Sequence, residues 1–562
     1  MNLRPYQTDA LDKSLERLQA GVNRQAVVMA TGLGKAVLFA SLRAHHAFQK
    51  RVMVLVHREE LAQQAADKIH RWNPGLLIGT EMASDYARPM DTHVVASVPT
   101  LGRKLSKRLG KFDPADFDCI VSDEMHHAPG EQWTRVLAHF GLDRPGSRLL
   151  SLGLTATPNR SDGVGLRHLF DEIIYDMGID RGIADGYLVD LACWRISTST
   201  NLDSVHTRAG DFAQDELGKE VNTPKRNALI VKAWAQYAKD KRTVAFTVNV
   251  QHALDLAEAF KALGVPSEAV WGEDTERANK LLRHRAGEID VLCNCAVLTE
   301  GYDDPGLECI VLAKPTKSPL LLTQMIGRGT RLPEGCGNIS EVGPSGKRSC
   351  LLLDVADLTS KHNIVSVPSL LGLPTALDMK GQTYRVTKQK IERIAKAFPQ
   401  ANLADLKSME SLEAIAHQVR LFEVKYPVEI KRLTGLAWRQ QGDGYFLPVE
   451  RGRLTLGKDL LGEWWVRGKL GDKQIEIHSQ NLAGAFNAAD AELSKSGNRG
   501  LYARDARWRD AGPSAKQVEL CRKLGIQIPE GARRGQISAA LDAHFFQRRG
   551  AVAMPEGING KR

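Results

Sequence analysis

Short apolar runs alternate with stretches of helical spacing over the first 190 residues of the chain. The runs lie at 26–29, 52–56, 94–98, 119–122 and 149–154, and segments such as Glu59–Trp72 separate them. Strands that are buried on both faces read as continuous apolar runs, so this alternation predicts a parallel sheet covered by helices. The pattern resumes with runs at 243–248, 289–294, 309–313 and 350–354. The expected fold class is therefore α/β, with one unit over 1–200 and a second over 215–358.

After residue 358 the pattern changes. Residues 359–433 show mainly helical spacing, and residues 434–478 hold short alternating runs that Gly-Asp turns interrupt. Alternation with a period of two between turns predicts a small antiparallel sheet. Helical spacing returns at 480–495 and 515–548. We therefore expect a helical segment over 359–433 and a mixed α+β accessory region over 434–562.

The composition is that of a globular protein without a membrane segment. The 562 residues are 43% apolar and 25% charged. No run approaches the roughly 20 apolar residues of a membrane span. The first residues lack the pattern of a signal peptide, so we expect the cytoplasm. The eight cysteines form no Cys-x-x-Cys pair, which argues against a structural zinc site.

Positive charge is concentrated in the last third of the chain. The whole chain carries a net charge of +10, and residues 361–562 hold 33 Lys and Arg against 21 Asp and Glu. A basic region suits a polyanionic partner such as nucleic acid. Solvated surface charge with no partner remains the alternative.

A glycine-rich segment, 30–36, follows the first apolar run and precedes a helical stretch. It reads Ala-Thr-Gly-Leu-Gly-Lys-Ala, so Thr31, Gly32, Gly34 and Lys35 stand where a phosphate-binding loop needs them. The glycines let backbone N–H groups close around phosphate oxygens, and Lys35 brings a positive charge to the β and γ phosphates. The segment therefore predicts a nucleotide site, with ATP and Mg²⁺ as cofactors.

Ala36 departs from the expected loop pattern. A Ser or Thr at this position would supply a hydroxyl ligand to Mg²⁺. A water molecule can take that place, because Mg²⁺ commonly keeps several waters. Nucleotide binding should survive, whereas hydrolysis could be slowed or, in the alternative, lost.

An acidic pair, Asp123 and Glu124, follows the apolar run at 119–122. Side chains at the carboxyl end of a parallel strand can face a nucleotide across the edge of the sheet. Asp123 would bind Mg²⁺, directly or through water, and Glu124 would take a proton from the attacking water. About 90 residues after a phosphate-binding loop, the pair indicates an ATPase.

Further segments complete an ordered set. They read LRPYQ (3–7), VHREEL (56–61), SVPTLGR (97–103), DEMH (123–126), TATP (155–158), TEGYD (299–303) and QMIGRGTR (324–331). With the phosphate-binding loop they resemble the motifs of superfamily 2 DExH-box helicases, in the family's order. Among these, the motifs are most similar to those of bacterial DNA helicases of the RadD kind and of the restriction and XPB kinds. The resemblance covers about 60% of the chain and leaves 360–562 unassigned.

The resemblance implies two tandem RecA-like lobes: a helicase ATP-binding domain and a helicase C-terminal domain. It implies nucleotide contacts from Arg4, Tyr6, Gln7, Gly301 and Asp303, with Gln7 reading the adenine base. It implies nucleic-acid contacts from Arg58, Thr100, Gly102, Arg103 and Thr299. It implies that His126, Thr155 and Thr157 couple hydrolysis to strand binding.

The segment at 324–331 links the second lobe to the nucleotide. If it is helical throughout, Gln324, Arg328 and Arg331 share one face. Guanidinium groups suit a phosphoryl-transfer transition state because they stay charged and offer paired donors. Since Lys35 and Glu124 belong to the first lobe, ATP should bind between the lobes, and hydrolysis should depend on their closure.

Aromatic residues stand beside cations in the accessory region. They are Trp438, Tyr445, Phe446, Trp464 and Trp465, among Arg439, Arg451, Arg453, Arg467 and Lys469. Such a set suits single-stranded nucleic acid, through base stacking and phosphate contact. The alternative is that the aromatic rings form the core of the small sheet.

We interpret the chain as an ATP-dependent helicase or translocase on DNA, in repair or in phage defence. One alternative is an ATP-binding nucleic-acid clamp or sensor that hydrolyses little, because Ala36 lacks the hydroxyl. Another is a motor on RNA, since the motifs do not distinguish the two nucleic acids.

Overall fold

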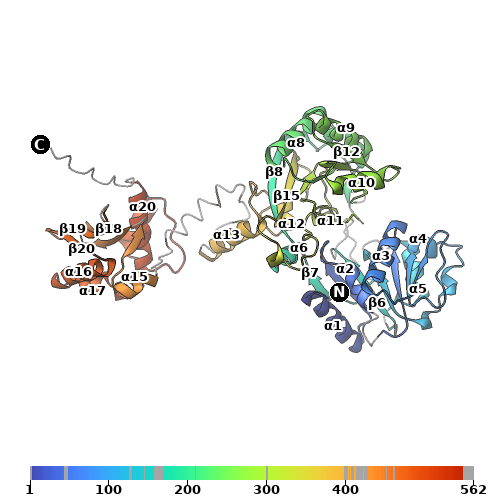
Figure 1. Cartoon of the computed structure of the whole chain (residues 1–562), viewed down its shortest axis with the longest axis horizontal. Helices are drawn as coiled ribbons and strands as arrows, with labels where there is room; N and C mark the ends of the chain where they lie inside the picture. Colours follow the sequence, from blue (N-terminus) through green and yellow to red (C-terminus); the bar gives the residue numbers. More distant parts are fainter. Residues whose placement is uncertain are drawn as a thin grey trace. The chain divides into compact units, whose positions relative to one another are not determined.

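The structure is a computed structural model of the 562-residue chain, which divides into two compact units (Figure 1). The first unit comprises Met1–Lys388 with Ala404–Met409, and the second comprises Gln389–Leu403 with Glu410–Arg562. The structure describes residues 3–42, 48–125, 130–144, 146–156, 169–208, 210–298, 302–397, 403, 406, 411–412, 422, 428–441, 444–450, 452–459 and 462–548.

The first sheet has seven parallel strands in the order β3-β4-β2-β5-β6-β1-β7. They are β1 (Arg24–Met29), β2 (Arg51–Val56), β3 (Ile78–Glu81), β4 (His93–Ser97), β5 (Phe117–Ser122), β6 (Leu150–Thr155) and β7 (Glu172–Met177). The helices with them are α1 (Pro5–Gln19), α2 (Lys35–Ser41), α3 (Glu59–Trp72), α4 (Val98–Leu101) and α5 (Glu131–His139). All six residues of β1 are buried, as expected for a strand with a neighbour on each side and both faces covered. We call this part, 3–177, lobe one.

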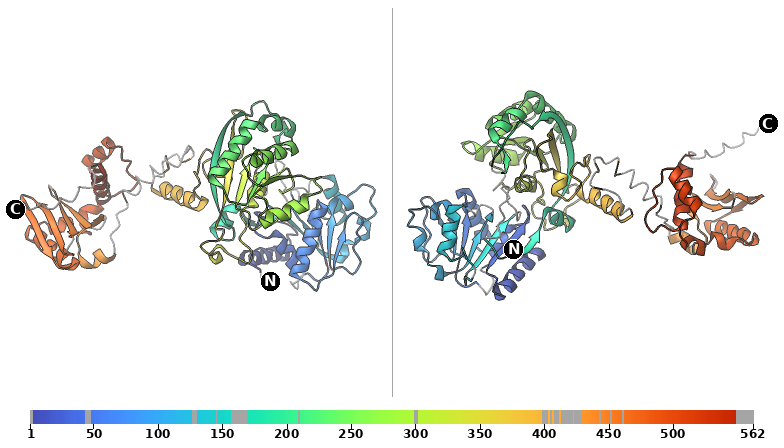
Figure 2. Two further views of the ribbon diagram at one scale, coloured as in Figure 1. Left: turned by 45° about the horizontal axis from the view of Figure 1, so that its top comes forward. Right: turned by 180° about the vertical axis from the view of Figure 1, so that it is seen from behind.

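The second sheet has six parallel strands in the order β12-β13-β11-β14-β15-β8. They are β8 (Asp190–Asn201), β11 (Thr243–Phe246), β12 (Ser267–Val270), β13 (Val291–Asn294), β14 (Cys309–Leu312) and β15 (Ser349–Leu358). The helices are α7 (Gln214–Val221), α8 (Pro224–Tyr237), α9 (Val250–Lys261), α10 (Arg277–Ala286), α11 (Pro319–Gly327) and α12 (Val367–Leu370), with a short hairpin of β9 (Thr207–Arg208) and β10 (Asp211–Phe212). Helices flank both sheets (Figure 2). We call 190–358 lobe two, and α6 (Ile179–Ala184) lies in the connection.

One strand belongs to a different sheet from the one expected. β8 lies inside the range assigned to the first unit, 1–200, yet it pairs with β15 along its length. Leu191 and Cys193 of β8 are buried in the second sheet, opposite Cys350 and Leu352. An apolar run predicts a strand but not its partner, so the sequence placed this boundary about ten residues too late.

The second unit contains a five-stranded antiparallel sheet in sequential order. Its strands are β16 (Arg439–Gln441), β17 (Gly444–Val449), β18 (Gly452–Lys458), β19 (Trp464–Leu470) and β20 (Lys473–Ser479). Its helices are α15 (Val428–Leu433), α16 (Leu482–Lys495), α17 (Arg499–Tyr502), α18 (Arg507–Asp510), α19 (Ala515–Lys523) and α20 (Arg534–Arg548), and α13 (Tyr384–Ala397) crosses from the first unit to the second. The expectation of an antiparallel sheet in a mixed accessory region is confirmed.

Within the residues that the structure describes, no helix is long and apolar enough to cross a membrane.

Candidate active site

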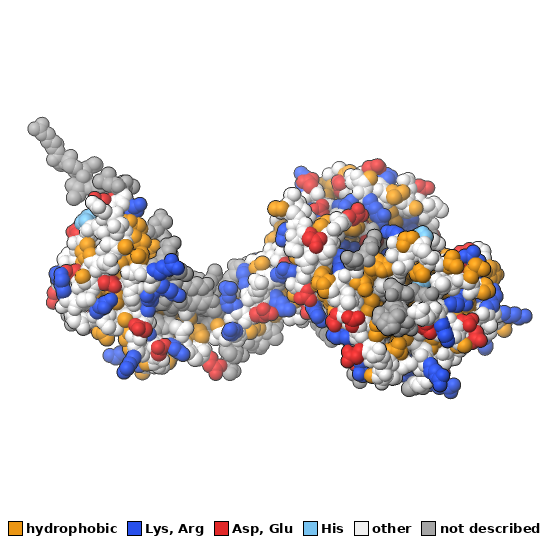
Figure 3. All heavy atoms as spheres, turned by 60° about the horizontal axis from the view of Figure 1, so that its bottom comes forward, with side chains coloured by type: hydrophobic (Ala, Val, Ile, Leu, Met, Phe, Trp, Pro, Cys, Tyr) orange, Lys and Arg blue, Asp and Glu red, His pale blue; other side chains and the backbone are white. Residues whose placement is uncertain are grey.

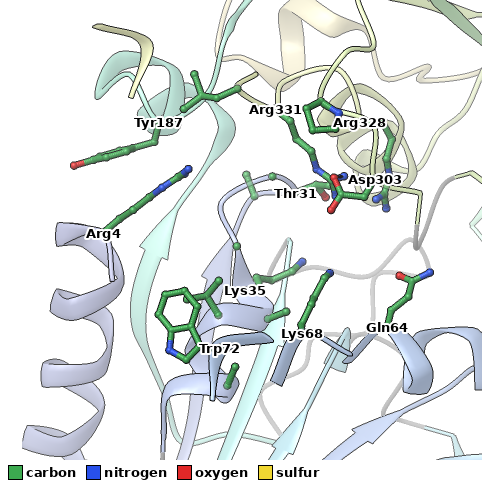
Figure 4. A pocket seen from close by; sticks show the side chains of 18 of the residues that line it. Arg4, Thr31, Lys35, Gln64, Lys68, Trp72, Tyr187, Asp303, Arg328 and Arg331 are labelled. Atoms are coloured by element: carbon green, nitrogen blue, oxygen red, sulfur yellow. Dashed lines mark hydrogen bonds and ion pairs between the residues drawn. The ribbon is translucent and has the colours of Figure 1, made fainter. Parts of the chain in front are cut away.

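A cavity of about 450 Å³ lies between the two lobes of the first unit. Figure 4 shows Lys35, Gln64 and Lys68 of lobe one facing Asp303, Arg328 and Arg331 of lobe two. Polar and aromatic residues that line the cavity are Arg4, Thr31, Lys35, Gln64, Lys68, Arg71, Trp72, Asp123, Glu124, Tyr187, Asp303, Arg328 and Arg331, with Gly32, Gly34 and Ala36 of the loop. The two lobes therefore contribute the predicted loop, acidic pair and arginine pair to one space.

The glycine-rich loop joins β1 to α2 and has two residues in the left-handed backbone region. Gly32 has φ +93° and Gly34 has φ +77°, a conformation that glycine adopts without a steric cost. A Cβ on Gly34 would also lie 2.8 Å from Nε2 of Gln7. The Leu33 carbonyl between them accepts hydrogen bonds from the Tyr6 hydroxyl, at 2.7 Å, and from Gln7 Nε2, at 3.1 Å. Helix α1 thus fixes the shape of the loop.

The residues near the amino terminus divide into two groups. Arg4 lines the cavity, and its Nη2 donates to the Cys336 carbonyl at 3.3 Å. Tyr6 and Gln7 are not among the described residues that line it. The Gln7 amide is engaged at both ends, since its Oε1 accepts from the Arg4 backbone N–H at 3.0 Å. Reading of adenine by Gln7 stays a prediction, because in this structure the amide supports the loop.

Lys35 and Glu124 form the ionic centre of the lobe-one side. Lys35 Nζ lies 2.9 Å from Glu124 Oε1, and both side chains are largely buried. Glu124 has φ +48°, in the left-handed region, and such backbone strain costs on the order of 1–3 kcal/mol in a residue other than glycine. Strain of this kind is typical of functional sites, where the surroundings hold it in place.

Asp123 lies beside this pair at the end of β5. Its Oδ1 accepts a hydrogen bond from the Glu124 backbone N–H at 3.1 Å. Burial, together with the neighbouring Glu124 carboxylate, raises the pKa of Asp123 to about 6, and the cations of Lys35 and Lys68 oppose the shift. A buried acidic pair of this kind is suited to binding a cation. Within the described ranges, no group of three or more His, Cys, Asp and Glu side chains is placed to hold a metal ion.

The arginines of lobe two converge, although not along one helix face. α11 ends at Gly327, with Arg328 at its carboxyl cap and Arg331 beyond it, so the expectation of a shared helical face is wrong. Instead, both guanidinium groups donate to the Tyr302 carbonyl, Arg328 at 2.9 Å and Arg331 at 3.2 Å. Arg331 also forms an ion pair with Asp303. Gln324 is buried in α11, outside the described lining.

Arg331 keeps its charge near neutral pH. Burial, together with the positive charge of Arg285, lowers the pKa of Arg331 to about 10. A guanidinium with this pKa is protonated at pH 7, so it can still stabilise negative charge in the cavity.

The loop of lobe one packs directly against lobe two. A Cβ on Gly327 would lie 2.5 Å from Cβ of Thr31, and a Cβ on Gly32 would lie 3.4 Å from Cγ of Arg331. The absence of a side chain at Gly327 therefore permits this close approach.

Sequence reasoning missed one group of lining residues, on α3. Gln64, Lys68, Arg71 and Trp72 are spaced so that they share one side of the helix, and all four line the cavity. Burial lowers the pKa of Lys68, and the charge of Arg331 lowers it further. The only signal was polar residues next to the apolar stripe of the helix, and this is common on surface helices.

The expected nucleic-acid contacts of lobe one lie at neighbouring strand ends. Arg58 precedes α3 after β2, and Thr100 lies in α4 after β4, the strand that pairs with β2. Arg58 and Arg103 are exposed, whereas Gly102 is buried. A Cβ on Gly102 would lie 2.6 Å from a backbone oxygen of Gln132. The structure therefore brings these residues to one edge of the sheet.

The remaining predicted residues are placed only in part. Thr155 ends β6 and is buried. His126, Thr157, Thr299 and Gly301 lie outside the described residues.

Comparison with known proteins places these features in a family. The family model "Type III restriction enzyme, res subunit" matches residues 1–160, and "Helicase conserved C-terminal domain" matches residues 225–333. The chain is 32% identical over 571 residues to the "Putative mitochondrial ATP-dependent helicase irc3" of Schizosaccharomyces pombe. That match covers 96% of this chain and 90% of the relative.

Two further relatives are matched over a smaller share of their length. The chain is 32% identical to the "Putative ATP-dependent helicase IRC3" of Saccharomyces cerevisiae, over 74% of this chain and 61% of the relative. It is 25% identical to the "Type I restriction enzyme EcoAI endonuclease subunit" of Escherichia coli, over 60% of this chain and 45% of the relative. Because the match to the S. pombe protein spans nearly both chains, this protein belongs to the Irc3 family of superfamily 2 ATP-dependent helicases.

Proposed function

We propose that this helicase hydrolyses ATP in the cavity between the lobes and couples hydrolysis to movement along DNA. The observation that carries the proposal is the convergence of Lys35, Asp123 and Glu124 from lobe one with Arg328 and Arg331 from lobe two. A volume of about 450 Å³ is in the ordinary range for a small-molecule site.

Lys35 has two proposed roles: it binds the phosphates of ATP, and it keeps the general base Glu124 paired until ATP is present. It would contact the β and γ phosphates, while the N–H groups of the loop close around their oxygens. Lys35 now pairs with Glu124 at 2.9 Å. If the Lys35 ammonium group turned from Glu124 to a phosphate, the Glu124 carboxylate would be free to accept a proton from the attacking water. The base would therefore become available only when nucleotide is bound.

Asp123 is the proposed ligand of Mg²⁺. Its buried carboxylate, next to a second carboxylate, fits a cation that prefers oxygen ligands. When bound, Mg²⁺ would neutralise charge on the β and γ phosphates. Ala36 has no side-chain oxygen to add, so water would complete the set of ligands.

Arg328 and Arg331 would stabilise the charge that develops on the transferred phosphoryl group. For this, Arg331 has to exchange Asp303 for a phosphate oxygen, while the Tyr302 carbonyl keeps its hold on both guanidinium groups. Gln324 stays a predicted catalytic residue. Because it does not line the cavity here, it would act only if α11 moved so that its side chain reached the cavity.

The proposed path of the nucleic acid follows the edge of lobe one. Arg58, Thr100, Gly102 and Arg103 would contact the strand there, with Thr299 from lobe two. His126, Thr155 and Thr157 would couple hydrolysis to this contact. The similarity to a restriction-enzyme subunit favours DNA over RNA. The compartment stays a prediction, since the S. pombe relative is named mitochondrial.

The test is steady-state ATP hydrolysis by the whole chain, with and without single-stranded DNA, duplex DNA and RNA. We expect hydrolysis that DNA stimulates more than RNA of matched length. Equally low hydrolysis under all conditions, with tight ATP binding, would instead support the ATP-binding clamp that Ala36 suggested.

A further inference from the structure

The antiparallel sheet of the second unit has one covered face and one open face. Tyr445, Leu456, Val466 and Ile477 lie opposite one another across β17 to β20. This face belongs to the apolar core that includes Phe486 of α16. Adjacent residues in a strand point to opposite faces. Phe446, Thr455, Arg467 and Glu476 therefore lie on the other face, as do Trp465 and Lys469.

The five aromatic residues divide between the two faces. Trp438 is fully buried, and Tyr445 and Trp464 pack against the same core. Phe446 and Trp465 lie on the open face by their register. The core interpretation is therefore confirmed for Trp438, Tyr445 and Trp464, whereas base stacking stays a prediction for Phe446 and Trp465.

The Trp465 indole lies on the open face against Gly457. Trp465 pairs in register with Gly457 of β18, and a Cβ on Gly457 would lie 2.5 Å from Cζ2 of the indole. The ring thus occupies the space above the glycine backbone, which no other residue type would leave free. The Arg467 guanidinium lies 5.0 Å from the ring centroid of Trp465. The indole is only partly buried, so it offers an aromatic surface that it shares with the Arg467 guanidinium lying over the ring.

The charge on this face is mainly positive. Arg453, Arg467 and Lys469 are exposed there, and Glu476 is an acidic residue of the same face, 3.1 Å from Arg467. On the covered side, in contrast, Lys473 is already paired with Glu492 of α16 at 2.8 Å. Lys and Arg side chains are spread over the visible surface of both units (Figure 3). Charge alone therefore does not identify the face, whereas charge together with the flat indole does.

The edge strand β16 limits the open face. Arg439 of β16 lies on the open face, but it is paired with Asp542 of α20 at 3.1 Å. It also donates to the Ala539 carbonyl at 3.4 Å. α20 therefore covers the β16 edge, and the open part runs over β17 to β20.

We propose that this face binds single-stranded DNA, with a base stacked on Trp465 and backbone phosphates contacting Arg467 and Lys469. Aromatic rings beside cations recognise single strands because every unpaired base offers a flat face. In a duplex those faces are already stacked, so the surface selects against duplex DNA. The inference rests on the proposed function only for the class of partner, and it requires no ATP.

The first test removes the ring. Trp465→Ala in the full chain should weaken binding of a labelled oligo-dT, measured by anisotropy without nucleotide, by about tenfold, whereas Trp465→Phe should retain most of the affinity. The control is Trp508→Ala. Trp508 lies in the same unit, is also partly buried and has the Arg509 guanidinium 4.6 Å from its ring centroid, but it belongs to α18. An equal effect of the Trp465 and Trp508 changes, or no effect of either, would overturn the proposal.

The second test removes charge from one side or the other. Arg467→Gln with Lys469→Gln should flatten the dependence of oligo-dT affinity on salt by about 0.7 per lost contact. Lys473→Gln with Lys495→Gln removes the same charge from the α16 side, where both lysines pair with Glu492, and should leave the slope unchanged. Equal slopes for the two double variants would contradict the assignment.

Two further arms keep the outcomes separate. An oligo-rU that binds this face more tightly than oligo-dT would overturn the assignment to DNA, and a larger loss for duplex DNA would overturn the stacking argument. If Trp465→Ala fails to fold, an iododeoxyuridine oligonucleotide should crosslink the wild-type chain within β19, and crosslinks confined to the first unit would refute the proposal. Loss of ATPase in Lys35→Ala should leave this binding intact.

Discussion

The cavity between the lobes and the open sheet face of the second unit use charge in opposite ways. In the cavity Lys35 and Glu124 are largely buried and paired with each other, and the largely buried Arg331 is paired with Asp303. On the sheet face Arg467 and Lys469 are exposed, and the pair that Arg467 forms with Glu476 is itself open to solvent. A buried charge is costly unless it is paired, whereas an exposed charge costs little and is screened by salt. Changes in the cavity should therefore act on turnover, and changes on the face should act on strand affinity.

The largest expected effect is that of Lys35→Ala. It should remove nearly all ATPase activity, because Lys35 is the lysine that the phosphate-binding loop itself brings to the cavity. DNA binding without nucleotide should stay near wild type, as should the ATPase of the control Lys13→Ala, an exposed lysine of α1. Coupled-enzyme ATPase assays and anisotropy measure the two quantities. A variant that keeps most of its turnover would refute the loop assignment.

Glu124→Gln should slow hydrolysis by roughly 10²–10⁴-fold, the usual contribution of a general base. The change preserves shape but removes the proton acceptor and the charge facing Lys35. ATP affinity, from equilibrium binding of a fluorescent analogue, should therefore stay close to wild type or rise. Normal turnover with weakened ATP binding would show that Glu124 has only a structural role.

Lys68→Met tests the α3 residues of the cavity. We expect about tenfold weaker ATP binding, as befits loss of one charged hydrogen bond, and Lys68→Arg should preserve most of the affinity. Burial and Arg331 both lower the pKa of Lys68, so ATP affinity should fall at alkaline pH earlier in wild type than in Lys68→Arg. Affinity that is unchanged in Lys68→Met would place this lysine outside the nucleotide contacts.

Ala36→Thr should raise turnover severalfold with a smaller change in ATP affinity. The added hydroxyl would join the Mg²⁺ ligands, whereas Lys35 and the loop amides already provide ground-state binding. Position 36 lies in the first turn of α2, where a β-branched side chain meets little crowding. If kcat measured with DNA does not change, the native site already has a substitute ligand such as a water held by Asp123.

The smallest effect, a change of slope, should follow from ending the chain after residue 388. ATP hydrolysis should persist, and the dependence of DNA affinity on salt should flatten by about 0.7 per lost phosphate contact. A deletion starting at 361 would be a poorer test, because it removes Leu377, Met379 and Tyr384, which are buried in the first unit. An unchanged slope would assign the contacts to the lobes.

The sequence predicts the parts of the fold and site that depend on local pattern. Apolar runs identify strands, and the glycine-rich loop and Asp123–Glu124 are recognisable because their chemistry needs adjacent residues. The local sequence pattern could not assign β8 to the second sheet, because the pairing of two strands depends on residues far apart in the chain. Nor could it find the end of α11 at Gly327 or the contribution of Lys68, which depends on how α3 packs.

The aromatic residues of the second unit show the same limit at closer range. Trp464 and Trp465 are adjacent in sequence, yet they lie on opposite faces of one strand. Period two separates the two residues but does not say which face is covered. That depends on where α16 packs, which is set by Phe486 and its neighbours.

The contact between Gly327 and Thr31 sets a lower limit on the separation of the lobes. A Cβ at position 327 would lie 2.5 Å from Cβ of Thr31, so one added methyl group would act as a spacer beside the phosphates. Gly327→Ala should then reduce activity without abolishing it. The variant should bind ATP normally, but its lobes should stop short of full closure. The size of the side chain at position 327 would thereby set how closely the two lobes approach in each ATPase cycle.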